Sequence, residues 1–327
     1  MSNPYYSGPA NGHFDGTRFY NPGHEITDKT LRDLWQWRRN RDRKVWPRKV
    51  DVQPAIPEAG VAGIRATMVG HASVLIQAAG LNILTDPVWS QRVSPFRWIG
   101  PKRVAAPGIA FDALPPIHVV LISHNHYDHL DLVTVSRLHK AHRPLFVVPL
   151  GNDGLIRKVA PDARISIGDW GTEVSLSSTA TATLVPANHW SARSLKDRRM
   201  ALWCGYVIRT ALGLVWFAGD TGYGDGSIFR DIRAAHGAPD LALIPIGAYE
   251  PRWFMQPQHI NPAEAVQIFL DVGAKLAGGI HWGTFQLTDE SREAPVEALA
   301  QALRAATIPD DNFVALAPGH VLDQRPG

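Results

Sequence analysis

Four side chains that commonly bind metal ions lie within six residues of the sequence. They are His124, His126, Asp128 and His129, in the stretch Ser-His-Asn-His-Tyr-Asp-His. Imidazole and carboxylate groups are typical zinc ligands. In an extended or turn conformation His124 and His126 point the same way and can share one ion. Asp128 and His129 lie beyond the turn and can face a second ion. The stretch therefore predicts half of a dinuclear zinc site.

The other half of this site is expected from three single residues, each of which follows a predicted strand. They are His189, Asp220 and His281. The first cluster also follows an apolar run, 117–122, with the length and β-branched composition of a strand. Five histidines and two aspartates suit two zinc ions that keep positions for water. Asp220 is the natural bridge between ions about 3.5–4 Å apart.

The pattern of strands and helices indicates how these ligands are positioned. Strands dominate the first half of the chain, and strands alternate with helices in the second half. The expected fold class is α/β (α+β), an αββα sandwich of two mixed β-sheets flanked by helices. Strands are expected at 64–69, 73–77, 81–85, 117–122, 145–149, 163–167, 173–176, 180–186, 202–209, 214–218, 241–246, 277–280 and 313–317. Helices are expected at 27–44, 132–142, 152–160, 227–236, 261–272 and 295–305.

Bulk composition indicates a globular protein, because 45% of its 327 residues are hydrophobic and 19% are charged. No apolar run is long enough to span a membrane, and the N-terminus has no signal pattern, so we expect a cytoplasmic protein. The single cysteine, Cys204, excludes an intrachain disulfide and a thiolate metal site. We expect its thiol to be buried and inert.

Residues 1–60 form an N-terminal arm in this interpretation, and residues 61–327 form the catalytic domain. Within the arm, residues 31–50 interleave arginine and lysine with Trp35, Trp37 and Trp46. A helix is expected from an N-cap at Thr27 or Asp28. The composition suits an anionic surface, either lipid headgroups or nucleic acid. It equally suits a solvated arm whose tryptophans pack onto the domain.

The ligand cluster, followed by a single histidine, aspartate and histidine at strand ends, resembles the metallo-β-lactamase fold superfamily over residues 61–320. Shorter motifs narrow this resemblance to the N-acyl-phosphatidylethanolamine-hydrolysing phospholipases D. They include Gly70-His71-Ala72-Ser73, Thr85-Asp86-Pro87-Val88 and the 12-residue run 244–255.

The resemblance implies a ligand set and a reaction. One Zn²⁺ would be bound by His124, His126 and His189, and a second by Asp128, His129 and His281, with Asp220 bridging the two ions. The reaction would be that of a zinc phosphodiesterase of phospholipase D type. A hydroxide held between the ions would attack an N-acyl-phosphatidylethanolamine or a related phospholipid. The products would be phosphatidic acid and the N-acylethanolamine-type alcohol.

The same resemblance places Gln258 and His259 near the reacting phosphate. His259 also directly precedes the helix expected from Asn261, where an imidazole can help hold an anion; the alternative is a structural cap contact. We expect three residues to carry the catalysis: Asp128, Asp220 and His259. Four residues are candidates for substrate binding: Gln258, His259, Tyr249 and Tyr127. Either tyrosine can equally belong to the core.

Two further residues, His71 and Asp86, are expected to fix the orientation of the ligands.

Competing functions use the same fold. The first is hydrolysis of another ester class, such as a lactone, a thioester or a nucleotide phosphodiester. A nuclease is disfavoured because only 60 residues separate Asp220 from His281. A binding module without enzymatic activity would need no hydroxide generator.

The expected partners follow from this function. They are a phospholipid or other phosphodiester substrate and peripheral contact with the inner face of a membrane, without nucleic acid. The oligomeric state stays open, with a homodimer as one option.

Overall fold

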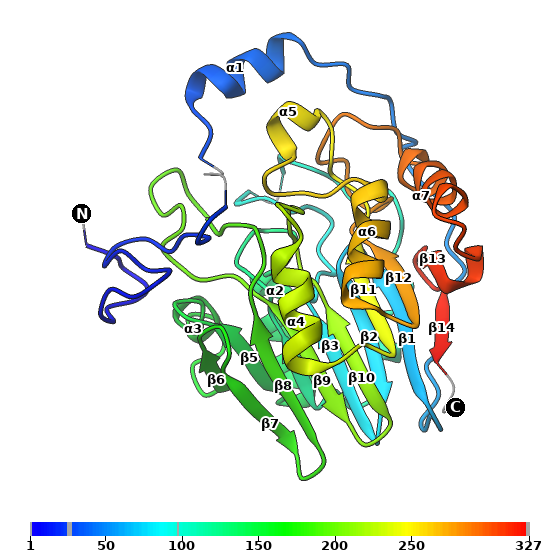
Figure 1. Ribbon diagram of the computed structural model, residues 1–327. Coiled ribbons are helices and arrows are strands. Elements are labelled where there is room, and N and C mark those ends of the chain that lie inside the picture. The colour runs from blue at the N-terminus through cyan, green and yellow to red at the C-terminus, as the bar shows by residue number, and fades with distance from the viewer. Residues whose placement is uncertain (1, 25–27, 97, 325–327) are drawn as a thin grey trace.

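Two seven-stranded β-sheets face each other in the computed structural model, which describes residues 2–24, 28–96 and 98–324. Helices cover the outer side of each sheet (Figure 1). The first sheet has the strand order β14-β1-β2-β3-β4-β5-β6, and the second has the order β13-β12-β11-β10-β9-β8-β7. Both contain parallel and antiparallel pairs. The predicted αββα sandwich of two mixed sheets is confirmed.

The strands of the first sheet are β1 Ile64–Gly70, β2 Ser73–Ala78, β3 Leu81–Thr85, β4 Val119–Leu121, β5 Leu145–Pro149, β6 Arg164–Gly168 and β14 Val321–Gln324. Those of the second are β7 Glu173–Ser177, β8 Ala180–Val185, β9 Gly205–Thr210, β10 Gly213–Phe217, β11 Leu241–Pro245, β12 Leu276–Ile280 and β13 Phe313–Ala315. The helices are α1 Leu31–Arg39, α2 Leu132–His142, α3 Asp153–Arg157, α4 Ser227–His236, α5 Arg252–Met255, α6 Pro262–Val272 and α7 Ala294–Ala305.

The core lies between the sheets, where Ile83, Val119, Ile208, Phe217 and Leu243 are buried together. Helices α4, α6 and α7 cover the outer face of the second sheet, and α2 and α3 cover that of the first. Strands β4 and β11 are therefore buried on both faces. Continuous apolar runs of this kind are typical of parallel strands. Cys204 belongs to the same core and is buried, as expected.

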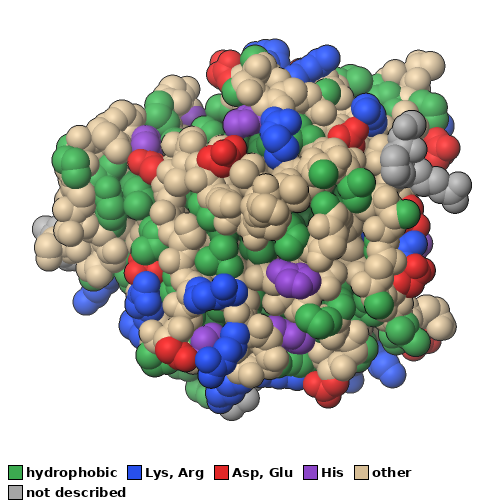
Figure 2. All heavy atoms as spheres, turned by 90° about the horizontal axis from the view of Figure 1, so that it is seen from below, with side chains coloured by type: hydrophobic (Ala, Val, Ile, Leu, Met, Phe, Trp, Pro, Cys, Tyr) green, Lys and Arg blue, Asp and Glu red, His purple; other side chains and the backbone are tan. Residues whose placement is uncertain are grey.

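Strand direction places the loops that matter for function at one end of the sandwich. Strands β8 and β10 each pair antiparallel with β9, so they run in the same direction. Strands β11 and β12 continue that direction, because β10, β11 and β12 pair in parallel. The C-terminal ends of β8, β10 and β12 therefore meet at the same edge. Helices α1 and α5 lie across this end (Figure 1). The opposite end shows acidic, basic and apolar side chains intermixed (Figure 2).

The N-terminal residues pack closely against the domain. Phe14 and Phe19 are fully buried, in a cluster with Leu202 and Trp203. Asn3 donates hydrogen bonds to the carbonyls of Thr17 and Met200. The first part of the predicted arm therefore covers the segment that carries His189.

Several elements differ in length from the sequence prediction. The run 117–122 forms only the three-residue strand β4, because only Val119–Leu121 pair with the neighbouring strands β3 and β5. The predicted helix 27–44 is shorter. Helix α1 starts after Thr30, which forms a capping box with Asp33. The predicted cap Thr27 lies outside the described residues, whereas Asp28 pairs with Arg198 and Arg199 and caps nothing.

Two further elements were not predicted. Helix α5 has four residues, too few to show a helical period. Strand β14 is an edge strand of alternating exposure that pairs with β1. Among the described residues, no helix is long and apolar enough to cross a membrane.

Candidate metal centre

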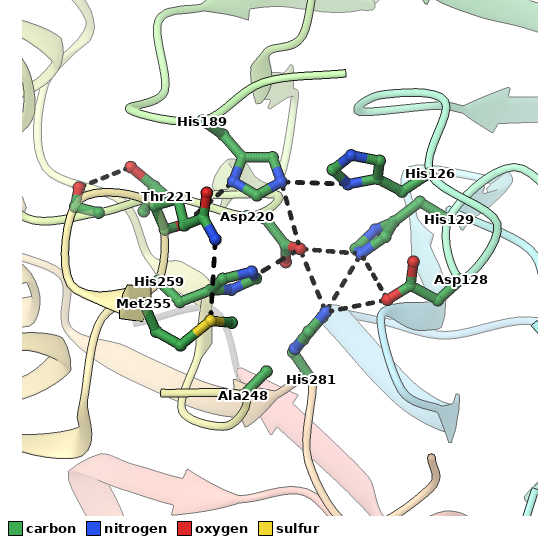
Figure 3. A network of polar contacts seen from close by, with 12 residues as sticks. His126, Asp128, His129, His189, Asp220, Thr221, Ala248, Met255, His259 and His281 are labelled. Carbon is green, nitrogen blue, oxygen red and sulfur yellow. Dashed lines mark hydrogen bonds and ion pairs between the residues drawn. The ribbon is translucent and has the colours of Figure 1, made fainter. Parts of the chain in front are cut away.

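All seven predicted metal ligands lie together at the loop end of the sandwich. Figure 3 labels all of them except His124. Asp220, which follows β10, is at their centre. Its Oδ2 lies 3.1 Å from Nε2 of His129 and 3.2 Å from Nε2 of His281. The same oxygen lies 3.7 Å from Nε2 of His189 and 4.0 Å from Nε2 of His124. A single carboxylate oxygen therefore faces four imidazoles that come from three loops, those after β4, β8 and β12.

The ligands divide into two groups around this oxygen. In the first group, Nδ1 of His126 lies 2.8 Å from Nε2 of His124 and 3.3 Å from Nε2 of His189. In the second group, Nε2 of His129 lies 3.2 Å from Nε2 of His281, and Oδ2 of Asp128 lies 3.6 Å from each of them. These are the two sets that the sequence predicts for two ions, with Asp220 between them.

The outward-facing ring nitrogen of three imidazoles has a fixed partner. Nδ1 of His124 lies 2.9 Å from Oγ of Ser123, and Nδ1 of His129 lies 2.7 Å from Oδ2 of Asp86. Nδ1 of His189 lies 3.0 Å from the carbonyl oxygen of Gln258. In each case Nε2 is left to face the centre. Such contacts set the tautomer and the orientation of a metal-binding imidazole.

Both residues that were predicted to orient ligands do contact them. Asp86 holds His129, and it also accepts hydrogen bonds from the backbone N–H and the hydroxyl of Ser123. Nε2 of His71 lies 2.9 Å from Oδ2 of Asp128. The turn between β1 and β2 and the end of β3, which carry none of the seven ligands, therefore supply groups that hold the ligands in place.

Four of the eight non-glycine residues with a left-handed backbone, among the described residues, lie around this centre. His71, Asp86, Ala248 and His281 have φ values of 61°, 34°, 62° and 63°. L-residues rarely adopt this left-handed region, and they persist there only where their surroundings hold them. The hydrogen bond from His281 N–H to the carbonyl of His71, at 2.7 Å, is one such constraint. Of these four residues, His281 is a candidate ligand, and His71 and Asp86 contact ligands.

The imidazoles of the first group are in the protonation state that a metal ion requires. Burial lowers the pKa of His126 and His189 to about 3, and it lowers the pKa of His124 well below its usual value. These rings are neutral at pH 7 and can offer a lone pair to a metal.

The second group is governed by its carboxylates. Burial opposes the charge on His281, but Asp220 and Asp128 outweigh it and raise the pKa of His281 to about 9. The pKa of His129 is raised well above its usual value in the same way, by Asp220 and Asp128 against burial. Conversely, although burial favours the neutral acid, His129 and His281 hold the pKa of Asp220 well below its usual value.

The donor set fits two divalent cations. Buried Oδ1 of Asp220, Nε2 of His126 and Nδ1 of His281 have no hydrogen-bond partner among the residues that the structure describes. Imidazole nitrogens and carboxylate oxygens gathered within 4.8 Å of one another are the donors that zinc and similar metals take. The first ion would take His124, His126 and His189. The second would take Asp128, His129 and His281, with Asp220 between them.

The predicted substrate residues lie at different distances from the centre. Nδ1 of His259 lies 3.9 Å from Oδ2 of Asp220, directly beside the ligands. The side chain of Gln258 is engaged with its neighbours, because it accepts a hydrogen bond from Trp190 Nε1 and contacts Met255 Sδ. Tyr249 is buried beside Glu290, where burial and that carboxylate raise the pKa of its hydroxyl.

Tyr127 lies between two ligands in sequence but packs beside them in space. Its hydroxyl donates a hydrogen bond to the carbonyl of Arg193, and the Arg193 guanidinium lies 3.9 Å from the centre of its ring. Both residues line an open pocket of about 410 Å³ next to the ligand loop. Arg92 and Arg137 line the same pocket.

Sequence reasoning missed three residues that support the centre. Ser123, which orients His124, directly precedes the cluster and could have been found there. Arg193 donates hydrogen bonds to the carbonyls of Asn125 and Leu130 and so holds the ligand loop from outside. Asn21 donates a hydrogen bond to the carbonyl of His189, 168 positions away, and no local signal in the sequence marks it.

Comparison with known proteins identifies the family. Residues 81–282, more than half of the chain, match the Beta-lactamase superfamily domain. The chain therefore belongs to the metallo-β-lactamase superfamily, and it is a metal-dependent hydrolase of that fold.

Particular relatives narrow this class. The chain is 37% identical over 270 residues to "N-acyl-phosphatidylethanolamine-hydrolyzing phospholipase D 1" of Caenorhabditis elegans, which covers 80% of this chain and 76% of that protein. It is 29% identical over 243 residues to a "UPF0173 metal-dependent hydrolase" of Pyrobaculum neutrophilum, covering 71% of this chain and 92% of the relative. The resemblance found in the sequence is thereby confirmed.

A solved structure supports the fold. Igni18, a metallo hydrolase from Ignicoccus hospitalis, superposes with a TM-score of 0.58 at 17% identity. The match covers 79% of this chain and 97% of Igni18.

We expect zinc binding to the metal-free protein at pH 7 to release protons. Because the pKa of His281 is about 9 and that of His129 is raised, both rings carry a proton that a metal must displace. The affinity should therefore rise with pH up to about 9. Calorimetric titration in buffers of different ionisation enthalpy measures the protons released. His139→Gln, at a ring beside the exposed Asp162, serves as the control. Equal heats in all buffers would contradict the assignment.

We expect Asp86→Asn to weaken zinc binding by about 10- to 100-fold. A carboxylate accepts hydrogen bonds from Ser123 and His129 together, whereas an amide turns one N–H₂ donor toward one of them. Competition with a chelator measures the affinity. Asp162→Asn, on the exposed partner of His139, is the matched control and should bind zinc like the wild type. An unchanged affinity in Asp86→Asn would show that Asp86 does not position His129.

Proposed function

We propose that this protein is a zinc-dependent phosphodiesterase of phospholipase D type. It would hydrolyse an N-acyl-phosphatidylethanolamine, or a related phospholipid, to phosphatidic acid and the N-acylethanolamine-type alcohol. The observation that carries this proposal is the 37% identity over 270 residues to the C. elegans enzyme of that name. The matched length includes most of the chain, and the expected ligands all lie together here.

The described residues supply positioning and charge for such a reaction. Two zinc ions held by the two ligand groups would lower the pKa of water and neutralise charge on phosphoryl oxygens. Oδ2 of Asp220 lies between the groups and would orient a hydroxide held there. Asp128 is held by His71 on one side and faces His129 and His281 on the other. The geometry of the centre is therefore fixed before substrate arrives.

His259 is the side chain best placed to contact the reacting phosphate. Its backbone is fixed at both ends, because its N–H donates to Met255 and its carbonyl accepts from Arg252. Nδ1 of His259 is buried and has no hydrogen-bond partner within the described parts of the chain. Burial lowers the pKa of His259 to about 3, so the ring is neutral at pH 7. A neutral ring in this position donates one hydrogen bond to a phosphoryl or leaving oxygen and needs no counter-ion.

The pocket next to the ligand loop suits an anionic substrate. Three arginines, Arg92, Arg137 and Arg193, line it against one acidic residue, Asp131. Guanidinium groups match the geometry of phosphate oxygens. A neutral ester or lactone would gain little from this charge, and the phosphodiester is therefore favoured over the other ester classes that the fold can accommodate.

The test is a substrate panel assayed on zinc-loaded protein. We expect N-acyl-phosphatidylethanolamine to give phosphatidic acid, with slower turnover of a lactone and a thioester. We expect His259→Gln to lower kcat on the phospholipid by about 100-fold or more, because it removes a group that contacts the reacting atoms. Metal content should stay unchanged, since the other assigned residues hold the ions. Product analysis and metal analysis on the same samples measure both quantities.

The matched control is His139→Gln, which changes a histidine next to the exposed Asp162 and should keep the wild-type kcat. Two results would count against the proposal. One is faster turnover of the lactone or thioester than of the phospholipid by the zinc-loaded wild type. The other is an unchanged kcat in His259→Gln, which would remove His259 from the reaction.

A further inference from the structure

Helix α1 lies across the loop end of the sandwich and is attached mainly at its ends (Figure 1). Just before the helix, Asp28 pairs with Arg198 and Arg199 in the loop that follows His189. Near its end, Trp37 Nε1 donates a hydrogen bond of 2.6 Å to Asp289, and the Trp37 ring packs 4.8 Å from Phe254 of α5. None of its nine residues, all of them described, is buried.

The two faces of α1 have different chemistry. Residues four apart share a helix face, so Asp33 and Trp37 lie together on the face toward the domain. Leu31 and Trp35 lie on the opposite side, with Leu34 beside them. Leu31 is 80% exposed, Trp35 is 59% exposed and Leu34 is 39% exposed. Three large apolar side chains on one exposed helix face form a surface that water solvates poorly.

Positive charge surrounds this apolar face. Arg32, Arg38 and Arg39 are all exposed, and the Arg39 guanidinium lies 5.1 Å from the centre of the Trp35 ring. The one acidic residue of the helix, Asp33, is occupied by the capping box with Thr30. The outer face of α1 is therefore both apolar and cationic.

We propose that the outer face of α1, formed by Leu31, Leu34 and Trp35 with Arg32, Arg38 and Arg39, binds the surface of an anionic lipid bilayer. An amphipathic helix of this composition buries its apolar side chains at the headgroup boundary while its arginines contact the phosphates. The inference rests on the proposed function for the identity of the lipid substrate, and it adds which surface of the protein meets the membrane.

The position of α1 would place a bound membrane near the metal centre. Helix α1 packs on α5 through Trp37 and Phe254, and His259 follows α5 by four residues. Trp253 of α5 is itself 45% exposed and adds a further aromatic ring near this surface. A bilayer bound to α1 therefore lies at the same end of the molecule as the metal centre, beside the helix that precedes His259 (Figure 1).

The chemistry favours a bilayer over two other occupants. A nucleic acid would leave Leu31, Leu34 and Trp35 against charged phosphates, where their burial gains nothing. A second copy of the chain would need about 800 Å² of surface on each partner. A nine-residue helix is only about 14 Å long and presents one face, which is too small for that area.

The test is co-sedimentation of the 327-residue chain with phosphatidylcholine vesicles, with and without phosphatidylglycerol. We expect binding to the mixed vesicles that weakens with added salt, and little binding to phosphatidylcholine alone. The variant Leu31→Gln, Leu34→Gln and Trp35→Gln should reduce binding about tenfold or more, since glutamine keeps helix propensity but removes the apolar face. The variant Arg32→Gln, Arg38→Gln and Arg39→Gln should remove the preference for anionic vesicles.

The matched control replaces apolar side chains of similar exposure elsewhere, Ile167→Gln, Leu270→Gln and Val321→Gln, and should bind vesicles like the wild type. Binding is measured without turnover, and a soluble short-chain phosphodiester assayed in parallel reports on the proposed function separately. Three results would overturn the inference: no binding by the wild type, equal binding by the Leu31, Leu34 and Trp35 variant, or a concentration-dependent dimer lost in that variant. If the wild type bound an oligonucleotide through α1 but did not bind vesicles, the helix would be assigned to nucleic acid instead.

Discussion

The structure depends on keeping two carboxylates and five imidazoles in close contact away from water. Oδ2 of Asp220 lies between 3.1 and 4.0 Å from four imidazole nitrogens, and both aspartates and all the rings are buried or nearly so. Polar groups removed from water cost several kcal/mol unless they are paired. The outward-facing ring nitrogens of His124, His129 and His189 therefore each have a partner, and their inward-facing nitrogens are left for cations. Oδ2 of Asp128 is held by His71.

The same constraint explains features of the fold that would otherwise be unrelated. Parallel strands bring the ends of β8, β10 and β12 to one edge, so ligands far apart in the sequence meet without long loops. The left-handed backbone at Asp86 and His281 turns their side chains inward. Arg193 and Asn21 fix the ligand loop and the His189 segment from outside. The strain and the supporting hydrogen bonds have a single purpose, which is a centre that is rigid before metal or substrate binds.

Most of the fold, and the clustering of the seven candidate ligands, could be predicted from the sequence because both leave local signals. Strands such as Leu81–Thr85 and Leu145–Pro149 are apolar runs bounded by turns, and the ligands directly follow strands. The supporting contacts leave no such signal. Asn21 reaches His189 across 168 positions, and Gln258 orients His189 through a backbone carbonyl that any residue would provide. The sequence prediction did not find the cap of α1, because Thr27, Asp28 and Thr30 are all acceptable N-cap residues. Asp28 is excluded only by its pairing with Arg198 and Arg199, which the sequence does not show.

The proposed function requires that the buried centre direct attack on phosphorus. The most direct measurement is hydrolysis of N-acyl-phosphatidylethanolamine by the zinc-loaded protein in ¹⁸O-labelled water, followed by mass spectrometry of every product. Attack at phosphorus places one ¹⁸O in the phosphate of phosphatidic acid and none in the N-acylethanolamine. Label in a released fatty acid, with unlabelled phosphate, would show that the centre hydrolyses a carboxylic ester and would contradict this account.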